Sequence, residues 1–224
     1  MSYEYKQFSR RKLPHIHSPG STIFTTFRLA DSIPKNVLRQ WLAEREFRNK
    51  AAELDEPEIQ FRRRWFAYFE DILDKAANGP RWLADPRIAQ IVADSLAYRN
   101  GRVYDLAAYC IMSTHVHSVF SPYLNETSLT EAKGSHPLRF ESSEATLSVI
   151  MQSLKGYTAH EANKVLNRTG AFWEVESYDH EIRDGEELGR VIRYVLNNPV
   201  KAGMVDHWSD WKWTYWRDAG NRTG

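Results

Sequence analysis

The sequence has almost no cysteine and no long apolar run. Cys110 is the one cysteine among the 224 residues, which excludes an intramolecular disulfide framework and any cysteine-based zinc cluster. The longest uninterrupted apolar run, 106–112, has seven residues. A membrane-spanning helix needs about 20, so we expect none. The N-terminal residues are charged and lack the apolar segment of a secretory signal, so we expect a cytoplasmic protein.

The chain also has little net charge. Its 30 Lys and Arg residues against 29 Asp and Glu residues leave a formal charge of +1. This balance neither predicts nor excludes a nucleic-acid partner, because basic residues can be segregated on one surface. Hydrophobic residues make up 42% and charged residues 26%, which is ordinary globular composition, so we expect one folded domain over residues 1–224.

Strand-like and helix-like segments alternate irregularly along the chain. This mixed order, without strict strand–helix alternation, predicts an α+β domain. Strands are predicted at 21–29, at 102–120 as two segments or one bent strand, and at 172–182. Helices are predicted as a hairpin-like pair within 34–78, at 86–99 after the N-cap Asp85, at 145–166, and at 186–197 before a stop at Asn198-Pro199, while 121–143 is predicted to be a polar loop.

Two histidines in a predicted strand are the strongest candidates for chemistry. His115 and His117 are two residues apart, so both side chains should leave the same face of the strand, with Val116 on the other. Two neutral imidazoles side by side are able to hold one divalent metal. The pair His15 and His17 has the same spacing, but it lies between prolines in a basic, turn-like segment, which favours a surface position.

A third metal ligand has two candidate sources. Tyr194 and Asn198 are spaced i to i+4, on one face of a predicted helix, and an amide oxygen at Asn198 would complete the site. Tyr157 and Glu161 have the same spacing on an earlier helix. Spacing alone favours simpler roles at the first pair, with Asn197-Asn198-Pro199 as a helix end and Tyr194 as a core aromatic.

An ordered set of short motifs gives the chain a family resemblance. The chain resembles the REP-associated tyrosine transposases, which are single-tyrosine nucleases of the HUH superfamily. The motifs lie, in this order, at Leu13–His15, Phe24–Leu29, Ala108–Phe120 around the histidine pair, Ser153–Ala159, Phe172–Glu174, Ser177–Arg183 and Tyr194–Gly203.

The resemblance implies a ferredoxin-like antiparallel sheet with helices against one face, here with the helical insertion 34–78. It also implies that His115, His117 and Asn198 hold a divalent metal, Mg²⁺ or Mn²⁺, with Tyr194 as the nucleophile. Tyr157 and Glu161 become the alternative nucleophile and ligand. This chain has Ser113-Thr114 where family members often have Pro-Asn, which alters the turn before the histidines but leaves both in place.

The implied activity is cleavage and rejoining of single-stranded DNA at REP-type hairpins through a 5′-phosphotyrosine. The alternative is a non-catalytic regulator that binds DNA hairpins. The resemblance implies a monomer or homodimer that associates with the bacterial nucleoid. The predicted phosphate contacts are Lys6, Arg10, Arg11, Lys12, Lys155 and Arg183.

Overall fold

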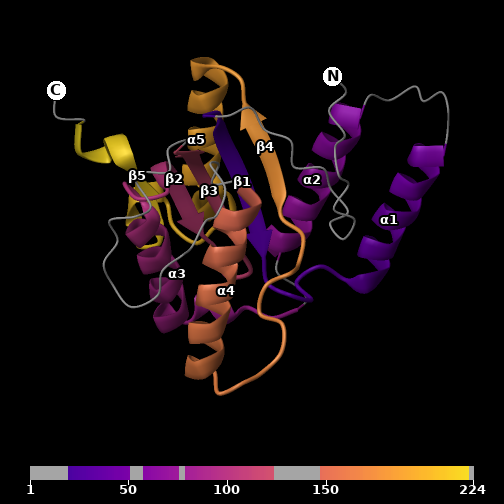
Figure 1. The fold of residues 1–224 in the computed structure, drawn as a ribbon, viewed down its shortest axis with the longest axis horizontal. Helices are drawn as coiled ribbons and strands as arrows, with labels where there is room; N and C mark the ends of the chain where they lie inside the picture. The colour runs from indigo at the N-terminus through magenta and orange to yellow at the C-terminus, as the bar shows by residue number, and fades with distance from the viewer. Residues whose placement is uncertain (1–19, 51–57, 76–78, 124–146, 222–224) are drawn as a thin grey trace, which may run out of the picture.

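A five-stranded antiparallel sheet forms the centre of the molecule (Figure 1). The computed structural model describes residues 20–50, 58–75, 79–123 and 147–221. The strand order is β4-β1-β3-β2-β5. This confirms the predicted α+β class with an antiparallel sheet. The strands are β1 (Thr22–Arg28), β2 (Tyr104–Ile111), β3 (His115–Pro122), β4 (Tyr178–Ile182) and β5 (Thr214–Trp216).

Helices cover both faces of the sheet. In Figure 1, α3 and α4 lie in front of the strands and α5 lies behind them. The resemblance implied helices against one face only, and the structure differs because α5 packs on the opposite face from α3 and α4. None of the described helices is long and apolar enough to cross a membrane. The helices are α1 (Lys35–Lys50), α2 (Glu58–Lys75), α3 (Pro86–Arg99), α4 (Leu147–Val165) and α5 (Gly185–Lys201), with short 3₁₀ turns η1 (Trp82–Ala84), η3 (Trp208–Asp210) and η4 (Arg217–Asn221).

The alternation of side chains along β3 separates two apolar clusters. Val116 and Phe120 belong to the cluster beneath α3 and α4, whereas Val119 belongs to the cluster beneath α5. Since successive side chains of a strand point to opposite faces, His115 and His117 lie on the α5 face. The predicted common direction of the two histidines is therefore confirmed by the strand geometry.

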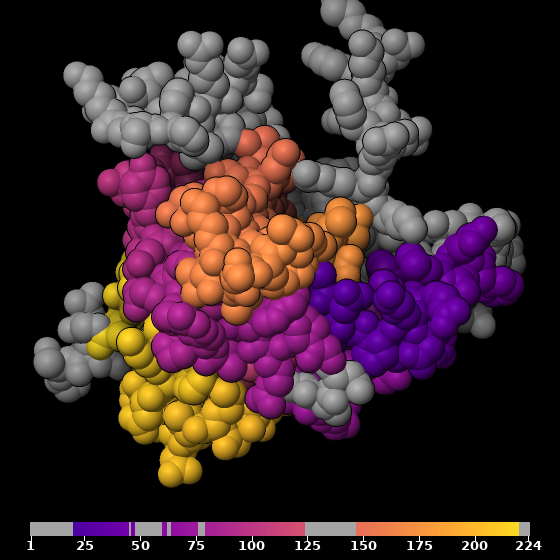
Figure 2. All heavy atoms as spheres, turned by 90° about the horizontal axis from the view of Figure 1, so that it is seen from below, coloured from indigo at the N-terminus to yellow at the C-terminus, as the bar shows by residue number. Residues whose placement is uncertain are grey.

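The two helices predicted within 34–78 are present as α1 and α2. These two helices lie beside the β4 edge of the sheet (Figure 1). In the view from below, the indigo atoms that include α1 form one side of the molecule, and the yellow C-terminal residues form the other (Figure 2). The pair has a small core of its own, which contains Val37, Phe61, Trp65 and Leu73. The loop predicted at 121–143 lies almost wholly outside the described residues.

Two predicted elements need correction, and one strand was not predicted. Within 172–182 the regular strand begins only at Tyr178, and Trp173 makes a single bridge to Leu29. The short strand β5 was not predicted. The last helix does not stop at Asn198-Pro199 but continues to Lys201. A proline removes one backbone donor, yet Pro199 is buried. The N–H of Ala202 closes the last turn of the helix on the carbonyl of Asn198 at 2.9 Å.

Phe27 provides a direct test of this core. Its side chain is 0% exposed, and its ring centroid lies 4.9 Å from that of Trp173. We expect Phe27→Ala to lower the free energy of unfolding by about 3–5 kcal/mol, because it removes apolar burial and leaves a cavity. The matched control is Phe47→Ala on α1, where the ring is 69% exposed and the change should stay within about 0.5 kcal/mol. Urea denaturation measures both, and equal effects would contradict the described packing.

Candidate functional site

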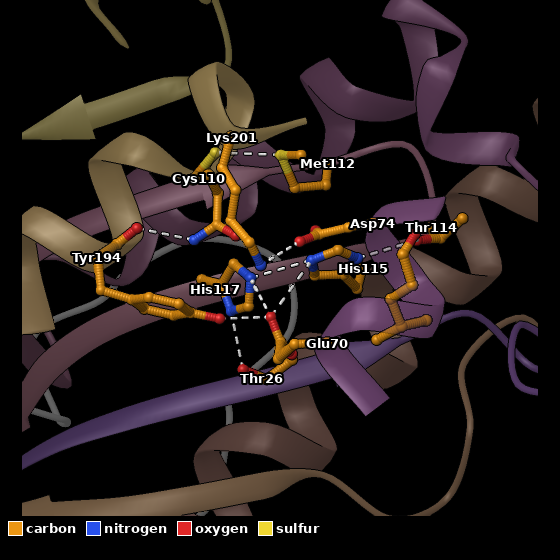
Figure 3. Close-up of polar contacts among 12 residues, drawn as sticks. Thr26, Glu70, Asp74, Cys110, Met112, Thr114, His115, His117, Tyr194 and Lys201 are labelled. Carbon is orange, nitrogen blue, oxygen red and sulfur yellow. Dashed lines mark hydrogen bonds and ion pairs between the residues drawn. The ribbon is translucent and has the colours of Figure 1, made fainter. Parts of the chain in front are cut away.

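The two histidines of β3 form the centre of the candidate site (Figure 3). Both side chains are fully buried, and their Nε2 atoms lie 3.0 Å apart. The antiparallel neighbours β1 and β2 hold β3 on both sides, so the backbone that carries the histidines is rigid. Two buried imidazoles with facing Nε2 atoms need a shared proton or a cation between or beside them.

Two threonine hydroxyls orient the rings. Thr26 Oγ1 lies 2.8 Å from His117 Nδ1, and Thr114 Oγ1 lies 2.9 Å from His115 Nδ1. These contacts engage both Nδ1 atoms and leave both Nε2 atoms directed into the site. In metal-binding histidines, the ring nitrogen that does not bind the metal typically has a hydrogen-bond partner of this kind. Thr114, which departs from the family pattern, thus contacts one of the two rings directly.

Glu70 of α2 completes a group that is able to hold a metal. Its Oε2 atom lies 3.1 Å from His117 Nε2 and 4.0 Å from His115 Nε2, and its side chain is almost completely buried. Ligand atoms of Glu70, His115 and His117 all lie within 4.8 Å of one another. A buried carboxylate beside two imidazoles is costly to desolvate unless it is paired with positive charge or protons. The donor set therefore fits a divalent cation.

Burial and mutual proximity set the charge states of these groups. Burial lowers the pKa of His115 to about 3, with His117 acting in the same direction, so His115 is neutral at physiological pH. Burial alone would raise the pKa of Glu70, but the neighbouring histidines and a hydrogen bond from Tyr194 outweigh it and lower the pKa to about 2. A neutral imidazole and an ionised carboxylate are the forms that ligate metals.

Tyr194 of α5 points its hydroxyl into the same group (Figure 3). The hydroxyl donates a hydrogen bond of 2.5 Å to Glu70 Oε2, and the ring lies 5.5 Å from that of His117. Phe24 and Phe66 flank the ring, at 5.9 and 6.2 Å between centroids. Burial, and then the charge of Glu70, raises the pKa of Tyr194 far above its usual value, so the free site holds a protonated phenol.

Asn198, the predicted third ligand, is buried one turn beyond Tyr194. Its Nδ2 atom donates to the backbone carbonyl of Tyr194 at 2.8 Å, and its Oδ1 atom has no hydrogen-bond partner among the described residues. A buried carbonyl oxygen without a donor is costly, and a cation would satisfy it. The amide therefore stays a candidate ligand beside Glu70.

The alternative pair is not brought to the histidines. Tyr157 and Glu161 belong to α4, which packs on the opposite face of the sheet. Tyr157 is 54% exposed, and Glu161 pairs with Lys164 at 2.9 Å. The sheet therefore separates this pair from His115 and His117.

The predicted DNA contacts are only partly described. Lys155 donates to the carbonyl of Val175 at 2.8 Å and to Ser177 Oγ at 3.2 Å, so it joins α4 to the segment before β4. Arg183 is exposed, in the turn between β4 and α5. The predicted basic contacts Lys6, Arg10, Arg11 and Lys12, like His15 and His17, lie outside the described residues.

Glu70 was not predicted, although the sequence carries a signal for it. Phe66, Glu70 and Leu73 are spaced i, i+4 and i+7, so the carboxylate stands within the apolar stripe of its helix. An acidic residue in such a stripe is buried when the helix packs, and it then needs a partner. The sequence pattern therefore indicates that Glu70 is buried, but it does not indicate which surface α2 packs against.

A comparison of the sequence with known proteins finds a relative. No protein-family model matches the chain. The chain is 24% identical over 111 residues to a Haemophilus influenzae protein named "Putative REP-associated tyrosine transposase". The match covers 50% of this chain and 58% of the relative, so it spans little more than half of that protein's length.

A solved structure shares the fold. It is described as a REP-associated tyrosine transposase bound to a REP hairpin, and the TM-score is 0.52 with 14% sequence identity. The match covers 96% of this chain and 87% of the other, and it confirms the predicted fold class. The predicted resemblance to REP-associated tyrosine transposases is thus confirmed once in sequence and once in fold.

Proposed function

We propose that the chain is a metal-dependent endonuclease and strand transferase that acts on single-stranded DNA at REP-type hairpins through a 5′-phosphotyrosine. The observation that carries the proposal is the hydroxyl of Tyr194 at 2.5 Å from a carboxylate that also contacts the histidine pair. The sequence relative and the solved structure, both named as REP-associated tyrosine transposases, support the substrate class. A hairpin-binding regulator without catalysis would not need this buried, polar arrangement.

The donor atoms of the site fit Mg²⁺ or Mn²⁺. His115, His117 and Glu70 would hold the ion, and the unpartnered Oδ1 of Asn198 supports a fourth contact. Both ions accept carboxylate and carbonyl oxygens, and imidazole is tolerated better by Mn²⁺. When bound, such an ion supplies positive charge to polarise the phosphate under attack and to stabilise the charge that develops on it.

The protein's own groups position the nucleophile. The oxygen of Tyr194 attacks the phosphorus, the bond from phosphorus to the 3′ oxygen breaks, and the downstream strand stays linked to the tyrosine through its 5′ phosphate. The phenol must lose its proton in this step, and the group that its O–H reaches is Glu70 Oε2. The covalent link keeps the phosphodiester energy, so a 3′ hydroxyl is able to reverse the step and rejoin strands.

Contacts between α2 and α5 support attack by the tyrosine of the same chain. Glu70 and Asp74 are one turn apart on α2; Glu70 accepts from Tyr194, and Asp74 accepts from Lys201 at 2.6 Å. Figure 3 shows both contacts next to the histidine pair. Two polar contacts along one helix hold α5 in register over the β3 histidines, so we propose that cleavage occurs in cis.

Trapping of the covalent adduct tests the proposed function. A single-stranded hairpin oligonucleotide is incubated with the protein and Mn²⁺, and the products are separated under denaturing conditions. A 3′-end label should migrate with the protein, whereas a 5′-end label should leave as a shorter fragment with a free 3′ hydroxyl. Hairpin binding without any adduct would instead support the non-catalytic regulator.

Mixing two inactive variants tests the cis arrangement. Tyr194→Phe lacks the nucleophile, and His115→Ala lacks one of the two facing imidazoles. If each active site uses only its own chain, an equimolar mixture should remain as inactive as either variant alone. Recovery toward about a quarter of wild-type activity, the share expected if subunits of a dimer exchange the tyrosine helix at random, would overturn the cis proposal.

A further inference from the structure

A cavity opens between the helical insertion and the sheet, next to the candidate catalytic group. Its volume is about 310 Å³, at the small end of the range for ligand pockets. The walls come from α1, α2, the end of β1 and the segment 174–178 that leads into β4. Most of the lining is apolar or aromatic, and the aromatic members are Trp41, Trp65, Phe66, Phe69 and Tyr178.

The cavity is continuous with the site because two residues belong to both. Glu70 lines the cavity while its Oε2 atom contacts His117 and the Tyr194 hydroxyl. Thr26 also lines it and contacts His117 through its hydroxyl. Whatever occupies the cavity therefore lies beside the group that reacts.

The charge of the lining selects against a phosphate. Arg28 is its one basic side chain among the described residues, and it already pairs with Glu174 at 3.3 Å. Three acidic side chains, Glu70, Glu174 and Glu176, share the same walls. Glu70 belongs to the proposed metal site and Arg28 is paired with Glu174, so the lining offers a phosphate of the DNA backbone no net positive charge, whereas a neutral group needs none.

The aromatic rings favour a flat, neutral occupant. Phe69 lies 5.7 Å from Trp41 and 5.4 Å from Trp65 between ring centroids, so the three rings form one cluster between α1 and α2. The indole N–H of the buried Trp65 has no acceptor among the described residues. The contacts of Arg28 with Glu174 and Ser32 both use its Nη1 atom, so the other N–H groups of the guanidinium are able to donate to the edge of a heterocycle. Nucleobases combine a stacking face with such an edge.

We propose that this cavity binds one unpaired nucleobase of the single-stranded substrate, next to the phosphate that Tyr194 attacks. The inference rests on the proposed function, since it takes the substrate to be single-stranded DNA. The helical insertion then has a role in selecting the cleavage position: it supplies Glu70 to the catalytic group and most of the walls for the adjacent base.

The first test is a cleavage assay with abasic substitutions. In the wild-type protein, an abasic site at one position flanking the scissile phosphate should slow cleavage on the order of 10-fold, within the range for loss of a stacked base. Trp41→Leu and Phe69→Leu keep an apolar wall but remove a stacking ring. Each substitution should slow cleavage of the intact substrate by a similar factor. In these variants the abasic site should slow cleavage little further, because the substitution and the abasic site remove the same interaction.

Trp82→Leu is the matched control, because Trp82 lies in η1 and does not line the cavity. In this variant the abasic site should slow cleavage as much as it does in the wild-type protein. If the abasic site slows the Trp41→Leu and Phe69→Leu variants as much, or if no flanking abasic site slows the wild-type protein, the inference is wrong. Thermal melting verifies that each variant is folded.

A binding assay separates this inference from the proposed function. 2-Aminopurine is moved one position at a time through the oligonucleotide, and its fluorescence is followed on binding to the metal-free protein. We expect quenching at one position, and its loss in the Trp41→Leu and Phe69→Leu variants. Quenching without any covalent adduct would retain the base site and reject the nuclease. An adduct without quenching at any position would retain the nuclease and overturn the base site.

Discussion

Replacing Tyr194 with phenylalanine is expected to abolish the covalent protein–DNA adduct completely. The substitution removes the one oxygen that contacts Glu70 and leaves the ring between Phe24 and Phe66, so the protein should fold normally. Without that oxygen no phosphotyrosine forms, and both the labelled adduct and the shorter fragment should disappear. Binding of the hairpin should change little, because the substitution removes one hydroxyl and leaves the ring in place.

Tyr157→Phe is the matched control for this result. It removes a tyrosine hydroxyl from α4, on the other face of the sheet from the histidines. The adduct should persist in this variant. An adduct that survives in Tyr194→Phe and vanishes in Tyr157→Phe would assign the nucleophile to Tyr157 and would contradict the arrangement around Glu70.

The histidine face could be predicted because it depends on local geometry. Alternation along one strand determines that His115 and His117 point the same way, whatever lies on either side of the sheet. The spacing of Tyr194 and Asn198 is equally local. Each of these predictions needs only the period of a strand or a helix, and that information is contained in a few consecutive residues.

The partner of the histidines could not be predicted in the same way. Glu70 precedes His115 by 45 positions and reaches it only because α2 packs against the site. Amphipathic periodicity places Glu70 on the buried side of α2 but does not specify which surface that side covers. The contact depends on tertiary packing, which the family resemblance did not include because the helical insertion lies outside the matched motifs.

Two further differences have the same origin. Pro199 is a stop signal by local rules, yet its burial offsets the lost hydrogen bond and α5 continues for another turn. The three residues of β5 are too few to give a periodic pattern, and they form a strand because the edge of β2 is available for pairing. In both places tertiary contacts override a weak local preference.

Replacing His117 with alanine is expected to lower the rate of cleavage on the order of 1,000-fold or more, which corresponds to the several kcal/mol that a bound metal contributes. His117 is the histidine that contacts both His115 and Glu70. Chelation of divalent ions with EDTA should give the same loss in the wild-type protein, and Mn²⁺ should restore it. Near wild-type cleavage by His117→Ala, or cleavage that resists EDTA, would contradict a metal site at this position.

The remaining choice lies between Glu70 and Asn198 as the principal third ligand. Titration of Mn²⁺ measured by calorimetry reports affinity without requiring catalysis. We expect Glu70→Gln to weaken Mn²⁺ binding by at least about 10-fold, because it replaces a charged ligand with a neutral one. Asn198→Ala should weaken Mn²⁺ binding less, because water is able to occupy the vacated position.

Glu161→Gln is the matched acidic control, since Glu161 pairs with Lys164 on the far face of the sheet and should leave Mn²⁺ affinity unchanged. A larger loss in Asn198→Ala than in Glu70→Gln would assign the third position to the tyrosine helix and leave Glu70 as a group that only positions the Tyr194 hydroxyl.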